Sequence, residues 1–506
     1  MATSTLTLPK TRRAVADATG REQAFRKVLA AMAVVVGFGL LAHLALILWA
    51  RHEFSPVESL VGIHSNMLFQ KGTLYYDLNR YPFTVTPYGP IFYALSGWLH
   101  NLGVPMYPAG RSISFCALVM ALWLVWRSLG YLGLSLYARA TGVILAASTS
   151  NILNWGTVGQ VDMLACAFSL CAVTAFLRFR EQKSFQAFIL AGVFVILAIL
   201  TKQTSLAAGL AIGATLLIEN RKRAWPWIAC VTIAGLQVAL AINLITSGRY
   251  FADAISANIN PFAAFKFFQH FNYFVLTGAG VIITVLAGTT AWARKISPLY
   301  TYAGFCTLIW AATASKTGSD LNYQVEMMFA LAMCAGAALD RLKFFESVFH
   351  SRRNWVTLLQ MPLLFHVLLN VVLTGRIVLE RAVMEPIRAK ETLALAPFVN
   401  RPGRILSVHY DSLATYRGDI EVEPFIYSVL VDLKLSNPYP VIHDIQEKQF
   451  AAVLLAEDIF VEKKGEPDPE APYLTGQHMA ALRANYKLTT KIDGPYGIYV
   501  YEPIRN

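Results

Sequence analysis

The sequence predicts an all-α polytopic membrane bundle of about eleven transmembrane helices, followed by a small C-terminal α/β domain outside the cytoplasm. Of 506 residues, 56% are hydrophobic and only 15% are charged, and the mean hydropathy is +0.47. This composition is far from that of a soluble globular protein. Long apolar segments recur up to about residue 375, and short alternating segments replace them beyond about residue 400.

About eleven segments are long and apolar enough to span a bilayer, which takes roughly 20 residues. Their centres lie near residues 39, 119, 143, 171, 193, 211, 235, 282, 306, 332 and 364. The first, about Val28 to Ala50, is too long for the apolar core of a signal peptide, so we expect a retained helix. Gly and Pro interrupt the apolar stretch 88–103, which predicts an interfacial helix, with a twelfth crossing as the alternative.

The basic residues predict how the bundle is oriented. If the N-terminal tail is cytoplasmic, every second loop should be rich in Lys and Arg. The loops that fit are Arg178/Arg180/Lys183, Arg221/Lys222/Arg223, Arg294/Lys295 and Arg341/Lys343/Arg352/Arg353. We therefore expect a multi-pass membrane protein with a cytoplasmic N-terminus and with its C-terminal domain outside the cytoplasm. The net charge of +12 then reflects topology and not nucleic-acid binding.

Four regions follow from this pattern: a basic tail (1–27), a transmembrane domain (28–375) with a first outer loop (51–110), and an extracytoplasmic domain (376–506). Outer loops of this length usually carry function. In the C-terminal domain, strands are predicted at RILSVH, FAAVLLAED, YKLTTKI and GIYVYEP, the last two joined by the turn DGPY. We expect this domain to serve as packing or a lid, with Asp411, Asp419 and His443 as exposed polar residues that no motif supports.

Glu58 is the most informative residue, because a carboxylate fixed at a membrane boundary is costly and usually functional. Amide, hydroxyl and cationic side chains are predicted on the same side of the membrane. This mixture suits a transfer in which a hydroxyl attacks carbon and a phosphate leaves. A carboxylate would accept the proton, and cations would stabilise the departing phosphate. All six cysteines fall in apolar segments, which argues against disulfides and a Cys-based metal site.

The order of several motifs resembles membrane glycosyltransferases of the GT-C fold, in the branch of bacterial lipid-linked-sugar transferases and protein O-mannosyltransferases. Glu58 is followed by MLFQKGTLYYDL and TPYGPIFYAL, in which Tyr88-Gly89-Pro90 is similar to a Tyr-Pro-Pro segment. Further matches are Arg111-Ser112 at the start of the second helix, GQVDML opening the fourth, LAILTKQTSL ending the fifth, and KTGSDLNYQVE in a late outer loop. The resemblance spans about residues 28–340 and implies a protein of a bacterial inner (plasma) membrane.

The resemblance implies an enzyme that moves a sugar, with inversion, from a polyprenyl phosphate donor to a hydroxyl of a lipid or glycan acceptor. By position, Glu58 is the base, Asp162 holds the acceptor or orients the base, and Lys202 and Arg111 bind the donor phosphate. Weaker substrate-binding candidates are His64, Tyr88, Gln160, Asn322, Tyr323 and Glu326. The first loop has no Asp-x-Asp or Glu-x-Asp pair, so we expect no metal and no other cofactor. Expected partners are the lipid-linked sugar, the acceptor and membrane lipids, without nucleic acid.

Simpler explanations exist for the main residues. Glu58 could be a solvated loop carboxylate or a helix cap. Asp162 is favoured at a helix start by the macrodipole alone, and Lys202 could extend to the membrane interface from a helix end. Two other functions stay open: a transporter or flippase, for which no repeated halves are evident in the sequence, and a non-catalytic partner in envelope polysaccharide assembly.

Overall fold

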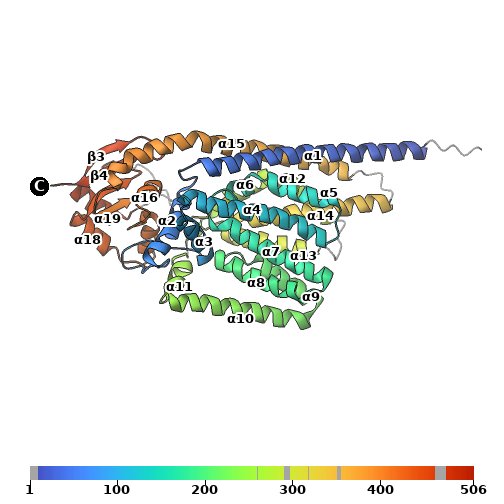
Figure 1. The fold of residues 1–506 in the computed structure, drawn as a ribbon, viewed down its shortest axis with the longest axis horizontal. Helices are drawn as coiled ribbons and strands as arrows, with labels where there is room; N and C mark the ends of the chain where they lie inside the picture. The colour runs from blue at the N-terminus through green and yellow to red at the C-terminus, as the bar shows by residue number, and fades with distance from the viewer. Residues whose placement is uncertain are drawn as a thin grey trace, which may run out of the picture.

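The molecule is an elongated helical bundle with an α/β domain at one end (Figure 1). The computed structural model describes the backbone of residues 10–258, 260–289, 297–316, 318–349, 355–461 and 474–505. Side chains are described within 27–258, 260–289, 297–316, 318–342, 359–461 and 474–505. Below, the end of the bundle that carries the C-terminal domain is called the domain end, and the opposite end the far end.

A helix occurs at each of the predicted apolar segments. These helices are α1 (Lys10–Trp49), α4 (Met106–Tyr131), α5 (Leu136–Ser148), α7 (Val161–Gln182), α8 (Phe185–Thr201), α9 (Ala207–Glu219), α10 (Arg221–Ile245), α12 (Ala264–Gly288), α13 (Ser297–Thr313), α14 (Val325–Phe349) and α15 (Trp355–Val399). Within the described residues, six of them are long and apolar enough to cross a membrane, and α5, α8 and α9 are shorter apolar helices. The predicted polytopic helical bundle is confirmed.

Shorter helices gather at the domain end. The first outer loop forms α2 (Pro56–Lys71) and α3 (Pro90–Asn101), and later connections form α6 (Ser150–Trp155), α11 (Arg249–Ala254), η1 (Ser256–Asn258) and η4 (Leu321–Gln324). With 12 residues, α3 is about 18 Å long at 1.5 Å per residue. It is therefore too short for a twelfth crossing.

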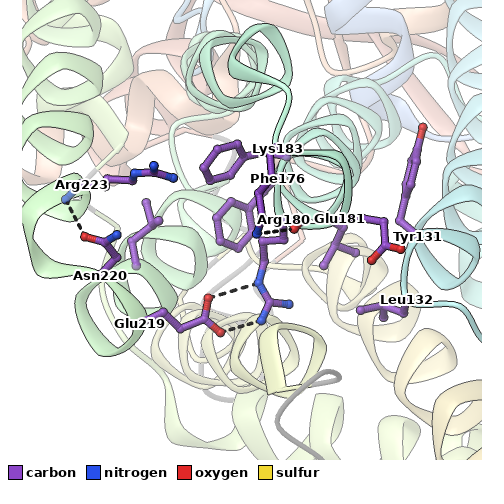
Figure 2. A pocket seen from close by; sticks show the side chains of 12 residues that line it. Tyr131, Leu132, Phe176, Arg180, Glu181, Lys183, Glu219, Asn220 and Arg223 are labelled. Atoms are coloured by element: carbon purple, nitrogen blue, oxygen red, sulfur yellow. Dashed lines mark hydrogen bonds and ion pairs between the residues drawn. The ribbon is translucent and has the colours of Figure 1, made fainter.

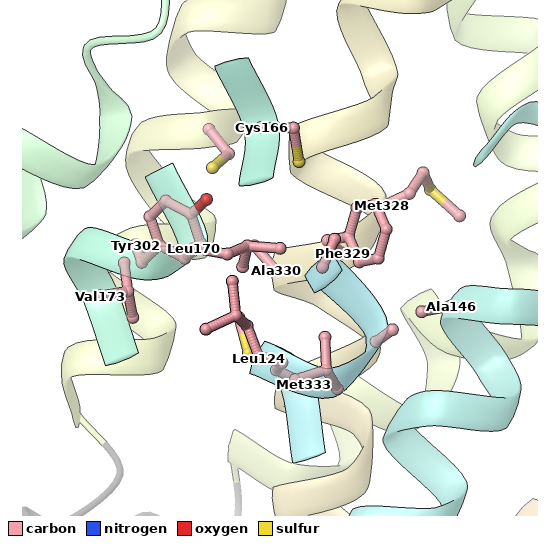
Figure 3. Packing of buried hydrophobic residues seen from close by; sticks show 14 of the residues in the cluster. Leu124, Ala146, Cys166, Leu170, Val173, Tyr302, Met328, Phe329, Ala330 and Met333 are labelled. Carbon is pink, nitrogen blue, oxygen red and sulfur yellow. The ribbon is translucent and has the colours of Figure 1, made fainter. Parts of the chain in front are cut away.

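The bundle core forms around α7, which packs against α4 on one side and α8 on the other. Figure 3 shows Leu124 of α4 and Leu170 of α7 beside Phe329 of α14, all within one buried cluster. Close approach needs small residues: a Cβ added to Gly336 of α14 would lie 2.5 Å from the carbonyl oxygen of Ala138 in α5. Such contacts let helices associate where the hydrophobic effect contributes little.

The C-terminal domain is a four-stranded sheet with helices. Its strands are β1 (Arg404–Ser407), β2 (Phe450–Leu455), β3 (Tyr486–Ile492) and β4 (Ile498–Pro503), in the order β1-β2-β4-β3. Only β1 and β2 are parallel among these pairs. The helices are α16 (Tyr410–Tyr416), α17 (Pro424–Asp432), α18 (Tyr439–Gln446) and α19 (Gly476–Asn485). Each strand falls in a predicted alternating segment, and the sheet starts after α15, which runs unbroken to Val399.

Backbone hydrogen bonds hold the C-terminal domain against the first outer loop. The amide of Phe83 donates to the carbonyl of Glu421, and the amide of Glu423 donates to the carbonyl of Phe83, both at 2.8 Å. The Asn66 side chain of α2 donates to the carbonyl of Gly418 at 2.8 Å. The domain is thus docked by fixed contacts onto the loop that follows the first helix.

Candidate functional site

A cavity of about 570 Å³, the main cavity, lies between the domain end of the bundle and the C-terminal domain. Glu53, Tyr88, Gln160 and Asn322 are among the residues that line it from the bundle and its loops. The C-terminal domain contributes Val408, Tyr410, Glu423, Phe425, Ala456, Tyr496 and Ile498. A smaller inner cavity of about 40 Å³ shares Asn322 with it. The C-terminal domain therefore covers a hollow that the bundle alone would leave open.

Asp162 and Lys202 form an ion pair at the inner cavity. Asp162 lies in the first turn of α7, and Lys202 follows the last turn of α8 in an extended conformation. The Lys202 Nζ lies 2.5 Å from Asp162 Oδ1, and the Asn322 side-chain amide donates to the same oxygen at 3.0 Å. Asp162 Oδ2 has no hydrogen-bond partner among the described residues.

Aromatic rings connect this ion pair to the main cavity. The Lys202 Nζ lies 4.1 Å from the ring centroid of Tyr323 and 6.0 Å from that of Tyr88, which lines the main cavity. Ring faces attract a cation at these distances. A phosphate at the boundary between the cavities would therefore meet the ammonium group of Lys202, the amide of Asn322 and the Tyr88 ring.

Glu58 lies in a different environment. Its Oε1 accepts from Arg111 Nε at 2.9 Å and from the Gly159 amide at 2.7 Å. Its Oε2 accepts from Arg111 Nη2 at 2.8 Å and from the Phe54 amide at 2.7 Å. The side chains of Glu58 and Arg111 are 2% and 0% exposed, and neither residue lines the main or the inner cavity.

Arg111 is fully engaged by these and further contacts. It donates to the carbonyls of Ala50 at 2.9 Å and His52 at 2.5 Å, and its guanidinium carbon lies 3.5 Å above the Phe54 ring centroid. A phosphate could reach Arg111 only by displacing these partners. The base and phosphate roles of Glu58 and Arg111 stay predictions, but their contacts are those of a clamp that joins α1, α2, α4 and the start of α7.

The weaker candidates divide between the two cavities and the protein interior. Tyr88 and Gln160 line the main cavity, Tyr323 and Glu326 line the inner one, and Asn322 lines both. His64 lines neither; its Nε2 lies 2.8 Å from the Thr84 hydroxyl oxygen. Burial lowers the pKa of His64 to about 4, so its imidazole is neutral at physiological pH.

Three carboxylates that line the main cavity were not predicted as site residues: Glu53, Asp320 and Glu423. Glu53 accepts a hydrogen bond from the Tyr496 hydroxyl at 3.0 Å, and burial, with the charge of Asp411, raises its pKa to about 7. Glu423 accepts from the Thr84 hydroxyl at 2.8 Å, and burial raises its pKa to about 7. Glu53 is the first acidic residue after the first apolar segment, and this position could have identified it as a site candidate from the sequence. Nothing in the sequence around Glu423 indicates that the docked domain delivers it to the cavity.

Asp411 corrects one expectation. It was expected to be exposed, yet it is only 1% exposed. It accepts from the hydroxyls of Tyr107 at 2.5 Å and Thr392 at 2.8 Å, and its Oδ2 lies 2.8 Å from His52 Nδ1. The reason is that α16 packs between α2 and α15, so a domain residue that looks isolated in sequence becomes buried at the docking surface.

Comparison with known proteins identifies the fold. The family model described as dolichyl-phosphate-mannose-protein mannosyltransferase matches residues 90–245. The crystal structure of ArnT from Cupriavidus metallidurans in the apo state has a TM-score of 0.63 at 14% identity, covering 96% of this chain and 98% of that chain. The chain has the GT-C glycosyltransferase fold.

Two further structures agree with the GT-C assignment. ArnT from the same organism bound to undecaprenyl phosphate has a TM-score of 0.60 at 14% identity, with the same coverage. The arabinofuranosyltransferase AftD from Mycobacteria has a TM-score of 0.55 at 14% identity, covering 94% of this chain but 40% of AftD. No curated protein sequence matches the chain. The family match extends from α3 to α10 and so includes Asp162 and Lys202, but not Glu58 or the C-terminal domain.

Further basic residues lie at or near the main cavity. Lys266 and His270 line it. The Lys316 Nζ donates to Asn258 Oδ1 at 3.1 Å, and burial, with the charge of Lys202, lowers the pKa of Lys316. The described residues contain no group of three or more His, Cys, Asp or Glu side chains placed to hold a metal ion. That the reaction needs no metal stays a prediction.

Proposed function

We propose that the chain is an inverting glycosyltransferase that moves a sugar from a polyprenyl phosphate donor to a hydroxyl of a lipid or glycan acceptor. The observation that carries the proposal is the pair of cavities at the domain end that share Asn322. The inner one holds Lys202 beside Asp162 and Tyr323, and the main one is lined by further aromatic, amide and carboxylate side chains. The ArnT structure of the same fold that holds undecaprenyl phosphate supports a polyprenyl phosphate as the donor carrier.

The reaction is a single displacement at the anomeric carbon. The acceptor oxygen forms a bond to that carbon on the face opposite the phosphate, the bond from the carbon to the phosphate oxygen breaks, and the acceptor proton passes to a carboxylate. The polyprenyl phosphate leaves with the electron pair of that bond. Lys202 stabilises the charge that develops on the phosphate, and a preorganised cation in a partly dry site is well suited to this task.

We assign proton acceptance to Glu53 in place of Glu58. Glu53 lines the main cavity and accepts from two hydroxyl groups, those of Ser59 and Tyr496. Both oxygens of Glu58 are instead held by the Arg111 guanidinium and backbone amides, away from the cavity. A general base works best when its pKa lies near the operating pH, and the pKa of Glu53 is about 7. In this assignment Glu58 holds the loop that carries Glu53.

The reaction takes place on the outer side of a bacterial inner membrane in this proposal. The support is the distribution of charge: the Lys- and Arg-rich connections after α7 and α9 lie at the far end, opposite the main cavity. Basic connections mark the cytoplasmic side, which leaves the cavity on the other side.

The experiment is a transfer assay in proteoliposomes, with radiolabelled undecaprenyl phosphate sugars as donors and an extract of envelope lipids and glycans as acceptors. Glu53→Gln is expected to reduce labelled product by about 10²- to 10⁴-fold, the usual contribution of a general base. Glu457→Gln in the C-terminal domain, outside the residues lining the main cavity, is the matched control and should retain activity. Movement of the labelled lipid across the bilayer without any glycosyl product would overturn the proposal in favour of a transporter.

A further inference from the structure

A second pocket of about 320 Å³ lies at the far end of the bundle, where α4, α7, α9 and the start of α10 meet (Figure 2). It is separated from the main cavity by the length of the bundle and shares no lining residue with it. The proposed reaction uses none of its residues. Its polar residues therefore call for a separate explanation.

The pocket has an apolar floor and a charged rim. Phe176, Leu177 and Leu216 form part of its wall and are nearly fully buried. Its charged lining residues are three cations and two carboxylates: Arg180, Lys183, Arg223, Glu181 and Glu219. Apolar walls below a charged rim match the boundary between acyl chains and headgroups in a bilayer.

One cation is already neutralised. Arg180 donates to Glu219 through Nη2 at 2.5 Å and through Nε at 3.2 Å, the pair joined by dashed lines in Figure 2. Because this pair satisfies Glu219, the carboxylate does not compete for the remaining cations. Glu181 is then the one other acid among the lining residues, and it lies beside Tyr131, on the side of Arg180 away from Arg223 (Figure 2).

Lys183 and Arg223 are the cations left for a ligand. Among the described residues, neither has a carboxylate within ion-pair distance. The Lys183 Nζ donates only to the carbonyl of Arg180 at 2.9 Å, and the Arg223 guanidinium lies 5.8 Å from the Phe179 ring centroid. Arg223 lies on α10 and Lys183 follows α7, so the two charges approach the pocket from different helices.

We infer that this pocket binds the phosphate of an anionic glycerophospholipid, such as phosphatidylglycerol, between Lys183 and Arg223. A basic pocket between membrane helices favours an anionic headgroup, because each Lys or Arg near the membrane surface adds to the attraction for anionic lipid. The apolar floor would contact the first carbons of the acyl chains. The bound lipid would tie α7 to α10, a helix whose apolar window is otherwise unburied in the protein.

The test uses the full chain, purified and delipidated in a neutral detergent, and native mass spectrometry with added phosphatidylglycerol or phosphatidylcholine. Wild type is expected to retain phosphatidylglycerol in preference, and Lys183→Gln/Arg223→Gln should reduce that retention roughly tenfold. The control, Arg178→Gln/Arg221→Gln, removes the same charge from exposed positions outside the pocket and should change retention less than about twofold.

Three results would overturn the inference. Equal loss in both double variants would mean diffuse attraction to a basic surface. Full competition by millimolar inorganic phosphate would identify a site for soluble anions. Unchanged retention in the pocket variant would exclude the pocket. If the double variant fails to fold, the single variants Lys183→Gln and Arg223→Gln replace it, and each is expected to reduce phosphatidylglycerol retention about threefold. Retention equal to that of wild type in both single variants would also reject the inference.

Discussion

Glu58–Arg111 and Asp162–Lys202 are two buried ion pairs at the same end of the bundle, yet they differ in how completely each carboxylate is satisfied. Each carboxylate oxygen of Glu58 accepts two hydrogen bonds, and neither Glu58 nor Arg111 lines the main or the inner cavity. In Asp162, one oxygen takes both contacts and the other has none among the described residues.

Under the proposed function, this difference separates a pair that holds helices together from a pair that can exchange partners. A buried ion pair with every lone pair occupied fixes its helices and has no capacity for a ligand. A pair that borders a cavity can release its cation to an incoming phosphate while water or substrate satisfies the acid. The residue type and its place after a helix do not distinguish the two cases; the number of partners does.

The largest expected effect is a loss of stability when the Glu58–Arg111 pair is broken. Glu58→Ala leaves Arg111 buried without its counter-charge and should lower the free energy of unfolding by about 3 to 5 kcal/mol. Thermal unfolding in detergent, followed by tryptophan fluorescence, measures this loss. Glu58→Ala/Arg111→Met should recover part of it. If Glu58→Gln instead folds with unchanged stability but loses transfer a hundredfold or so, Glu58 is the base after all.

The next largest effect is expected on sugar transfer when the Asp162–Lys202 pair is broken. Lys202→Gln should reduce kcat/KM by about 10²- to 10³-fold, the usual cost of removing one group that stabilises transition-state charge. Its stability loss should be smaller than that of Glu58→Ala, because Asp162 borders a cavity. The exposed Lys71, changed to Gln, is the matched control. Unchanged kcat/KM would remove Lys202 from the donor site.

A smaller effect is expected from pH. With a pKa of about 7, Glu53 must lose its proton to act as base, so kcat/KM should rise about tenfold between pH 6 and pH 8 and level off above. The sign for stability is opposite. The folded state holds the Glu53 proton more tightly than the unfolded state, so stability should fall as pH rises from about 4.5 to about 7. Glu53→Gln should flatten the kcat/KM profile and reduce the slope of the stability profile, leaving the part that comes from Glu423, whose pKa is also raised to about 7. An unchanged kcat/KM profile would point to another group.

The smallest effect concerns the ion pair at the far end. Arg180 and Glu219 have side chains 20% and 22% exposed, so water screens their attraction. In a lipid-free sample, Arg180→Gln should change the free energy of unfolding by less than about 1 kcal/mol. A loss as large as that of Glu58→Ala would show that exposure does not separate the two kinds of pair in this protein.

Local sequence features predicted the helices and strands well, but they predicted fewer of the residues that line the cavities. The apolar segments near residues 119 and 171 became α4 and α7, and YKLTTKI and GIYVYEP became the hairpin of β3 and β4. Tyr88 and Asn322 lie near Lys202, and Gln160 lines the main cavity, because the alternation of crossings puts their loops at one end. Their substrate-binding roles stay predictions. Glu423 could not be predicted, since it reaches the cavity through backbone pairing with Phe83, more than 300 positions away.

The sequence by itself determined that the chain forms a polytopic bundle with its polar residues gathered at one end, because the cost of placing polar groups in hydrocarbon depends on local composition. Only the tertiary structure decided which acid faces a cavity and which is enclosed by its partners. Glu58 finds Arg111, and Asp162 finds Lys202, across distances in sequence that no local pattern encodes. The ability of a carboxylate to meet substrate depends on those partners, which form only when distant segments pack together.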